Sequence, residues 1–181
     1  NLAGAKLVCQ LMGVHDEEFY SSIISFKGAD KRLETVLKMK DRNVFKDFAH
    51  SPSKVVASTK ALKKQFYDRK LIALLELHTF SSLNENFINE YRNTLKSADI
   101  AILYYDPKAV LKKGLSKLDH QKIKSAFNDD RLNIFNDSNK LNDFLLKQSY
   151  SNSNLLFMSS GNYASIDLDL LINQIRISEW F

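Results

Sequence analysis

Cysteine is almost absent from the sequence, because Cys9 is the single example among 181 residues. One cysteine excludes a disulfide within the chain and any cysteine-rich metal site. The four histidines lie far apart and lack the spacing of metal ligands. We therefore predict no metal site in this chain.

Long apolar runs are also missing. No run approaches the roughly 20 residues that a helix needs to cross a bilayer. Residues 1–6 lack the basic region and the apolar stretch of a secretory signal peptide. Together with the scarcity of cysteine, these features predict a cytoplasmic protein that does not enter a membrane.

Common enzyme signatures are not found either. The sequence has no G-x-x-x-x-G-K-S/T phosphate loop, no G-x-G-x-x-G after a strand and no G-x-S-x-G elbow. A hydrolase built from Ser160, His78 and Asp106 has no support from their spacing. The chain therefore contains no recognisable phosphate-binding loop for ATP.

The charge balance is mildly basic, with 26 lysine and arginine residues against 21 acidic residues. Basic residues neutralise phosphates, so a nucleic-acid binder is one alternative, and its binding would weaken steeply with salt. The basic residues are, however, spread along the chain without a zinc-finger spacing or an arginine-rich run. We expect a solvated surface that suits an anionic small molecule, and no nucleic-acid partner.

Two helices are predicted at the start of the chain. Residues 1–13 carry an apolar helical stripe that ends at Gly13. Asp16 is placed to cap a second helix that runs to about residue 26. The pattern then breaks at residues 26–30, which indicates a junction between two structural units.

Strand and helix patterns alternate through the rest of the chain. Strands are predicted at residues 33–39, 43–48, 71–77, 100–105, 132–135 and 155–159. Helices are predicted at residues 51–67, 83–96, 120–127, 140–148 and 168–177. This alternation predicts an α/β fold with a Rossmann-like, mostly parallel sheet and helices on both faces.

Polar residues follow several of the predicted strands, and ligands of open parallel sheets bind beyond these strand ends. A helix is predicted to start within residues 47–52, and its N-terminus offers free N–H groups and a partial positive charge. These groups would bind an anion, which His50 could orient. Asp47 could accept from a hydroxyl pair such as a ribose. The alternative is that Ser51 only caps the helix and that His50 is an ordinary surface residue.

Two further strand ends offer similar alternatives. Residues 76–82 read E-L-H-T-F-S-S, which presents polar groups to a ligand or simply supplies a serine cap for a helix. Gly161 allows a ligand to approach the backbone closely, or it belongs to a turn.

Two motifs carry a family resemblance. Residues 26–34 read F-K-G-A-D-K-R-L-E, which resembles the F-x-G-x-x-x-R-x-E junction of the Mur ligase family. Residues 47–52 read D-F-A-H-S-P, which is similar to the D-Y/F-A/G-H-x-P motif of that family. Residues 1–13 resemble a helix late in the central domain of these enzymes. The similarity continues in order through residues 159–162, so it covers nearly the whole chain.

The resemblance implies the tail of a central ATP-binding domain at residues 1–28 and a C-terminal domain, which brings the incoming amino acid or peptide, at residues 29–181. In this family, ATP and Mg²⁺ convert the carboxylate of UDP-N-acetylmuramate into an acyl phosphate, which an incoming amine turns into an amide. By this resemblance the catalytic residues and magnesium ligands lie upstream, and none is expected here. A non-catalytic module that binds a nucleotide or peptide is the alternative of another class.

The resemblance also assigns individual residues. Arg32 and Asp47 match positions that contact the nucleotide, chiefly near its ribose. Substrate-binding positions are expected at His50, Ser51, His78, Thr79, Ser81, Ser160, Gly161 and Asn162.

Two branches of the family compete as the nearest match. The alanine-adding branch has Q-P-H-R-Y-x-R where residues 76–82 stand, so the histidine is kept and both arginines are lost. Since an arginine fork is well suited to hold a carboxylate, this loss argues against L-alanine. The tripeptide-adding recycling branch, with M-S-N-G-G-F beside residues 158–163, is closer. We expect L-Ala-γ-D-Glu-meso-diaminopimelate as the incoming substrate, with L-alanine as the alternative.

Overall fold

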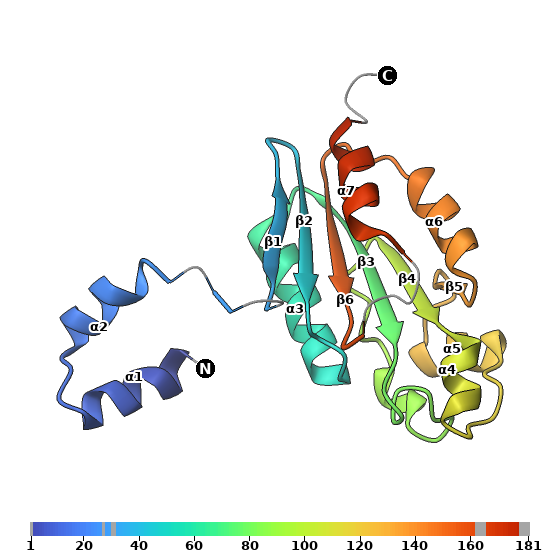
Figure 1. Ribbon diagram of the computed structural model, residues 1–181, viewed down its shortest axis with the longest axis horizontal. Helices are drawn as coiled ribbons and strands as arrows, with labels where there is room; N and C mark the ends of the chain where they lie inside the picture. Colours follow the sequence, from blue (N-terminus) through green and yellow to red (C-terminus); the bar gives the residue numbers. More distant parts are fainter. Residues whose placement is uncertain (1, 27, 30–31, 162–165, 178–181) are drawn as a thin grey trace. The chain divides into compact units, whose positions relative to one another are not determined.

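The computed structural model describes residues 2–26, 28–29, 32–161 and 166–177 (Figure 1). The chain separates into two compact units, Asn1–Asp30 and Lys31–Phe181. The predicted junction at residues 26–30 lies partly outside the described residues. In the described part of the chain, no helix has the length and apolar character that a membrane span needs.

The first unit consists of α1 (Leu2–Leu11) and α2 (Asp16–Ile23), as the apolar periodicity predicts. The cap of α2 is His15 rather than Asp16, whose carboxylate is instead engaged by Lys6 and by Gln10, each at 2.7 Å. No side chain of α1 is buried, and Leu11 is 89% exposed. This unit therefore has almost no core of its own.

The second unit is built on a six-stranded sheet. Its strands are β1 (Glu34–Lys38), β2 (Arg42–Asp47), β3 (Lys70–Leu77), β4 (Ile100–Tyr105), β5 (Asn133–Phe135) and β6 (Ser153–Met158). The strand order is β1-β2-β6-β3-β4-β5, and only β1 is antiparallel to its neighbour. The pairing of β1 with β2 is irregular between Thr35 and Leu37. The predicted α/β, mostly parallel fold is confirmed.

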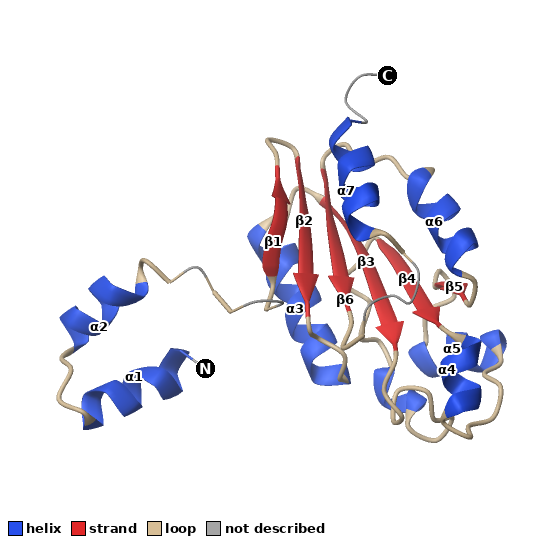
Figure 2. Ribbon diagram, viewed as in Figure 1, coloured by secondary structure: helices blue, strands red, loops and turns tan. Residues whose placement is uncertain are grey.

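Helices cover both faces of this sheet (Figure 2). They are α3 (Pro52–Gln65), the short 3₁₀ helix η1 (Ile88–Tyr91), α4 (Pro107–Lys112), α5 (His120–Phe127), α6 (Ser138–Leu146) and α7 (Leu168–Ile177). One apolar cluster joins α3, η1, α4 and α5 to the sheet, and a second joins α6 and α7 to the opposite face. Residues of β3 alternate between the two clusters, as expected for a central parallel strand.

The predicted helix at residues 83–96 is wrong, because only η1 is helical within this range. Asparagines redirect the backbone there. The Asn84 side chain accepts a hydrogen bond from the Asn86 N–H at 2.8 Å, and Asn93 has a left-handed φ of 61°. Helix α4 was not predicted, although Asp106 caps it by accepting from the Lys108 N–H at 2.8 Å and Pro107 occupies its first turn.

Asp129 holds the turn that follows α5. Its carboxylate accepts two bonds from the Arg131 guanidinium, at 3.0 and 2.9 Å, and one from the Arg131 N–H at 3.1 Å. Burial would raise the pKa of the Asp129 carboxyl, but the Arg131 bonds outweigh it and hold the pKa below the ordinary value of 3.8. The ionised form is thus favoured in the folded protein.

We expect Asp129→Asn to lower the free energy of unfolding at pH 7 by about 1–3 kcal/mol, because bonds to a charged group are lost. Since the pKa is depressed by folding, this contribution is complete above pH 3.8 and disappears as the pH falls through the folded value. Urea unfolding at pH 7 and pH 3 measures both effects. The exposed neighbour Asp130 supplies the control variant Asp130→Asn, and equal losses in the two variants would contradict the assignment.

Candidate functional site

The carboxyl ends of β2, β6 and β3 lie side by side at one edge of the sheet. Met158 pairs with Asp47 on one side and with Leu75 on the other. The next residue, Ser159, donates its N–H to the Asp47 carbonyl at 3.1 Å. The predicted polar segments at residues 47–52, 78–82 and 159–161 therefore meet at this edge.

Asp47 is positioned by the helix that follows it. The Ser58 hydroxyl, on α3, donates to the Asp47 carboxylate, and the Asp47 side chain is half-buried. Because Ser58 fixes one carboxylate oxygen, the orientation of the whole group is set before any ligand arrives. A carboxylate held in this way suits a pair of hydroxyl groups.

Arg32 and His50 both contact the ring of Phe48, the residue that follows Asp47. The Arg32 guanidinium lies 5.1 Å from the centre of the Phe48 ring, and the His50 ring meets the same ring edge-on at 5.2 Å. The His50 Nδ1 atom is 2.8 Å from the Phe48 carbonyl, which places the proton on Nδ1 and leaves Nε2 for another partner. A cation and an imidazole thus share one edge of the site.

Tyr91 fixes the backbone of His50. Its hydroxyl donates to the His50 carbonyl, and its ring stacks on Phe127 at 5.3 Å. Burial raises the pKa of Tyr91 to about 12, against the opposing effect of a hydrogen bond with Ser82. The phenol therefore stays protonated and keeps the His50 backbone in place.

Ser51 begins α3 as predicted, but its hydroxyl does not cap the helix. Pro52 occupies the first helical position and has no N–H, and the first helical bond is the one from Val55 N–H to the Ser51 carbonyl at 3.0 Å. The Ser51 hydroxyl makes no bond with the helix start, so it lies at the site edge without a structural task there.

A buried carboxylate links the ends of β3 and β6. Glu76 is only 2% exposed, and the Ser159 hydroxyl donates to it. Ser159 Oγ in turn accepts the Gly161 N–H at 2.7 Å, and His78 Nδ1 lies 3.9 Å from Glu76. Both residues lie in polar strand-end segments that the sequence indicates, but no binding role was predicted for Glu76 or Ser159. The signal was available, because Glu76 is an acid inside an otherwise apolar strand.

The segment after β3 bonds mainly to itself. The Thr79 hydroxyl lies 2.9 Å from Ser82 Oγ and 3.2 Å from Ser81 Oγ, and it accepts the Ser82 N–H at 3.2 Å. These bonds form a local turn, which corresponds to the capping alternative. The assignment of Thr79 and Ser81 to substrate binding stays a prediction.

Ser160 and Gly161 complete the edge, whereas Asn162 lies outside the described residues. The buried Ser160 hydroxyl has no hydrogen-bond partner among the residues that the structure describes. A Cβ atom built on Gly161 would lie 2.8 Å from His78 Cγ and 2.9 Å from the Glu76 carboxylate. Gly161 is therefore required for the close approach of β6 and β3, and no bond in the described part supports a Ser160, His78 and Asp106 triad.

No protein-family model matches the sequence. A UDP-N-acetylmuramate–L-alanine ligase of Agathobacter rectalis is 25% identical over 173 residues, which is 94% of this chain and 37% of that protein. The chain is a homologue of the Mur ligases. The resemblance found in the motifs is thereby confirmed, and the chain spans less than two fifths of the length of this relative.

Two solved ligase structures have the same fold as this chain. A UDP-N-acetylmuramate–alanine ligase of Thermotoga maritima gives a TM-score of 0.68 at 14% identity, over 96% of this chain and 36% of that one. A murein peptide ligase of Psychrobacter arcticus gives a TM-score of 0.64 at 20% identity, over 97% of this chain and 35% of that one.

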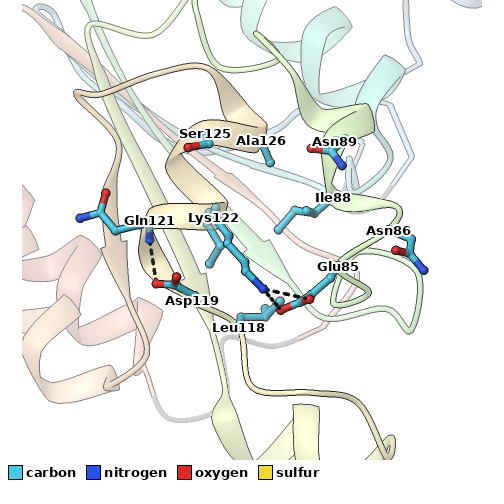
Figure 3. A pocket seen from close by; sticks show the side chains of 11 residues that line it. Glu85, Asn86, Ile88, Asn89, Leu118, Asp119, Gln121, Lys122, Ser125 and Ala126 are labelled. Atoms are coloured by element: carbon cyan, nitrogen blue, oxygen red, sulfur yellow. Dashed lines mark hydrogen bonds and ion pairs between the residues drawn. The ribbon is translucent and has the colours of Figure 1, made fainter.

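This chain also has a hollow of about 460 Å³ between η1 and α5, away from the residues assigned above (Figure 3). Glu85 and Lys122 point toward one another across it at 3.4 Å. Such an exposed ion pair contributes little to stability. In residues 2–26, 28–29, 32–161 and 166–177, no cluster of three acidic, histidine or cysteine side chains could hold a metal ion.

We expect Gly161→Ala to lower the free energy of unfolding by about 1–3 kcal/mol, because the new methyl group overlaps His78 and Glu76. Thermal and urea unfolding measure this loss. In a His78→Ala background, one of the two overlapping groups is gone and the same substitution should cost less. An equal cost in both backgrounds would show that His78 does not crowd Gly161.

Proposed function

We propose that this chain is the C-terminal part of an ATP-dependent ligase that joins an amine to UDP-N-acetylmuramate during peptidoglycan precursor synthesis or recycling. The observation that carries the proposal is the similarity over 94% of the chain to a relative with that name. The two motifs support it, because Arg32 of the first contacts Phe48 of the second, beside Asp47 and His50 at the end of β2.

We propose that residues 1–28 end the central ATP-binding domain and that residues 29–181 form the C-terminal domain. The apolar side chains of α1 support this division. Leu2 and Val8 of α1, and Met12 just after it, are all more than half exposed, although they lie on one apolar helical stripe that needs a partner. A preceding domain would supply that partner.

This division predicts that a chain of residues 32–181 unfolds as the longer chain does. Because the first unit has Phe19 as the only buried residue of its two helices, its removal should shift the midpoint of thermal unfolding by no more than about 2 °C. Circular dichroism of the two chains tests this. A loss of cooperative unfolding in the shorter chain would show that α1 and α2 belong to the second unit.

Arg32 and Asp47 are proposed to hold the ribose end of the nucleotide. A guanidinium beside Phe48 and a carboxylate oriented by Ser58 fit a hydroxyl pair and a nearby phosphate. The described residues do not fit a magnesium ion, since they offer no cluster of acidic ligands. ATP would supply the phosphoryl group that activates the carboxylate, and Mg²⁺ would be held by the upstream domain.

The part of the chemistry assigned to this chain is positioning. The incoming amine must lie close to the activated carboxyl carbon, where it forms the amide bond as phosphate leaves. His50, Ser51, His78, Thr79, Ser81, Ser160, Gly161 and Asn162 are proposed to bind the incoming substrate. The unbonded Ser160 hydroxyl and the free Nε2 of His50 are the groups best placed to accept or donate new bonds.

We infer that the incoming substrate is the tripeptide L-Ala-γ-D-Glu-meso-diaminopimelate. The support is the β3 end, where a self-bonded turn of Thr79, Ser81 and Ser82 stands in place of an arginine fork. L-alanine is the second candidate, because the relative from Agathobacter rectalis is named as an alanine ligase.

The full-length protein tests both candidates. With ATP, Mg²⁺ and UDP-N-acetylmuramate present, we expect phosphate release to require the tripeptide and to stay at background with L-alanine. A coupled phosphate assay, with mass spectrometry of the product, measures the outcome. Release with L-alanine alone would reject the inferred tripeptide, and release with neither amine would reject this ligase function.

A further inference from the structure

Glu76 is a carboxylate inside the apolar central strand. It is 2% exposed on β3, and its neighbours Leu75 and Leu77 are buried with it. Burying a carboxylate costs stability, and a neutral side chain of similar size often gives a core that is equally stable or more stable. A charge kept at this position, at the carboxyl edge of the sheet beside the candidate site, therefore points to a role in that site.

The two carboxylate oxygens of Glu76 face different groups. Oε2 accepts a hydrogen bond from the Ser159 hydroxyl, just after β6. Oε1 lies 3.9 Å from Nδ1 of His78, which is two residues further along the chain. The carboxylate thus connects the end of β6 to the imidazole that follows β3.

Gly161 makes room for this arrangement. A Cβ atom built on it would lie 2.9 Å from His78 Nδ1 and 2.9 Å from Glu76 Oε2. The absence of a side chain therefore lets the imidazole and the carboxylate lie next to each other. The Gly161 N–H also donates to Ser159 Oγ at 2.7 Å.

The hydrogen bonds of Ser159 decide where the proton of the imidazole lies. Because Ser159 Oγ accepts the Gly161 N–H, its own proton goes to Glu76. A carboxylate only accepts hydrogen bonds, so its other oxygen favours a proton on the nitrogen that faces it, His78 Nδ1. A neutral imidazole then carries its lone pair on Nε2.

The surroundings of this lone pair suit a cation. The His78 side chain is 43% exposed, whereas the Glu76 side chain is closed to solvent, so a ligand meets the imidazole and not the carboxylate. An acceptor nitrogen with a buried negative charge behind it is complementary to an ammonium group. The incoming substrate of the proposed ligase carries such a group, because its amine forms the amide bond.

We propose that Glu76 is a positioning residue, which holds the proton on His78 Nδ1 and so presents Nε2 as the acceptor for the ammonium group of the incoming substrate. This inference rests on the proposed ligase function. Glu76 touches no ligand itself. It acts through His78, and the Ser159 hydroxyl orients its carboxylate.

Glu76→Gln tests this role with little change in size. The amide keeps its oxygen toward the Ser159 hydroxyl and turns its NH₂ group toward His78 Nδ1, which must then be unprotonated. The proton moves to Nε2, where it opposes an ammonium group. In the full-length protein we expect kcat/KM for the incoming substrate to fall about tenfold and KM for ATP to stay unchanged. Steady-state phosphate release, with the tripeptide and with L-alanine, measures both.

Three comparisons separate positioning from a structural role. In a His78→Ala background, Glu76→Gln should cause no further loss, because the group through which Glu76 acts is gone. The midpoint of thermal unfolding of Glu76→Gln should equal or exceed that of the wild type, since a buried charge is removed. The matched control is Glu90→Gln, which changes an exposed acid on η1 and should leave the kinetics unchanged. A lower midpoint with unchanged kcat/KM would make Glu76 a structural residue only.

NMR of the full-length protein with ¹⁵N-labelled histidine observes the proton directly, and loss of a signal in His78→Ala assigns it. The measurement is made at about pH 8.5, above the ordinary histidine pKa of about 6.5. We expect the proton on Nδ1 in the wild type and on Nε2 in Glu76→Gln. The same tautomer in both proteins would overturn the proposal.

The outcomes distinguish this proposal from the ligase function on which it rests. If the wild type releases phosphate with either amine, but Glu76→Gln lowers kcat/KM equally with and without His78, or not at all, Glu76 is not a positioning residue and the ligase function stands. If the wild type releases phosphate with neither amine, the ligase function is rejected, and with it the ammonium group as the partner of Nε2. The tautomer measurement then decides whether Glu76 orients His78.

Discussion

The burial of β3 between two helical layers is the constraint on which the structure depends. Leu71–Leu77 are all buried, and the strand pairs in parallel with β4 on one side and β6 on the other. Because parallel strands share one direction, their carboxyl ends lie along a single edge of the sheet. The chain returns to the opposite edge through helices on the two faces, so the edge with the carboxyl ends stays open. The candidate site exists where it does because of this arrangement.

One polar contact among these buried strands affects both the stability of the fold and the arrangement of the candidate site. Glu76 lies on the buried strand itself, where an unpaired carboxylate would be costly. The Ser159 hydroxyl bonds it, and Ser159 also holds Gly161 against His78. The polar groups at the ends of β3 and β6 are therefore arranged by the same contact that makes burial of Glu76 tolerable.

Local pattern predicted the elements better than it predicted the contacts. β4, α5 and α7 have the bounds expected from apolar periodicity, because burial leaves a regular trace in the sequence. The helix expected at residues 83–96 failed, since asparagine side chains compete there with helical backbone bonds. The bond between Ser159 and Glu76 joins positions 83 residues apart, and no local pattern encodes such a meeting. The contact of Arg32 with the face of the Phe48 ring likewise depends on tertiary structure.

The two borders of the sheet have a consequence for how other molecules meet this unit. On one border, the pairing of β1 is interrupted between Thr35 and Leu37, and on the other, β5 is only three residues long. Neither border presents a long, regular row of backbone donors and acceptors, which is what a strand from another chain needs for docking. The sheet is thus poorly suited to grow by strand addition, which protects it from aggregation and leaves the strand ends and helices as the surfaces for recognition.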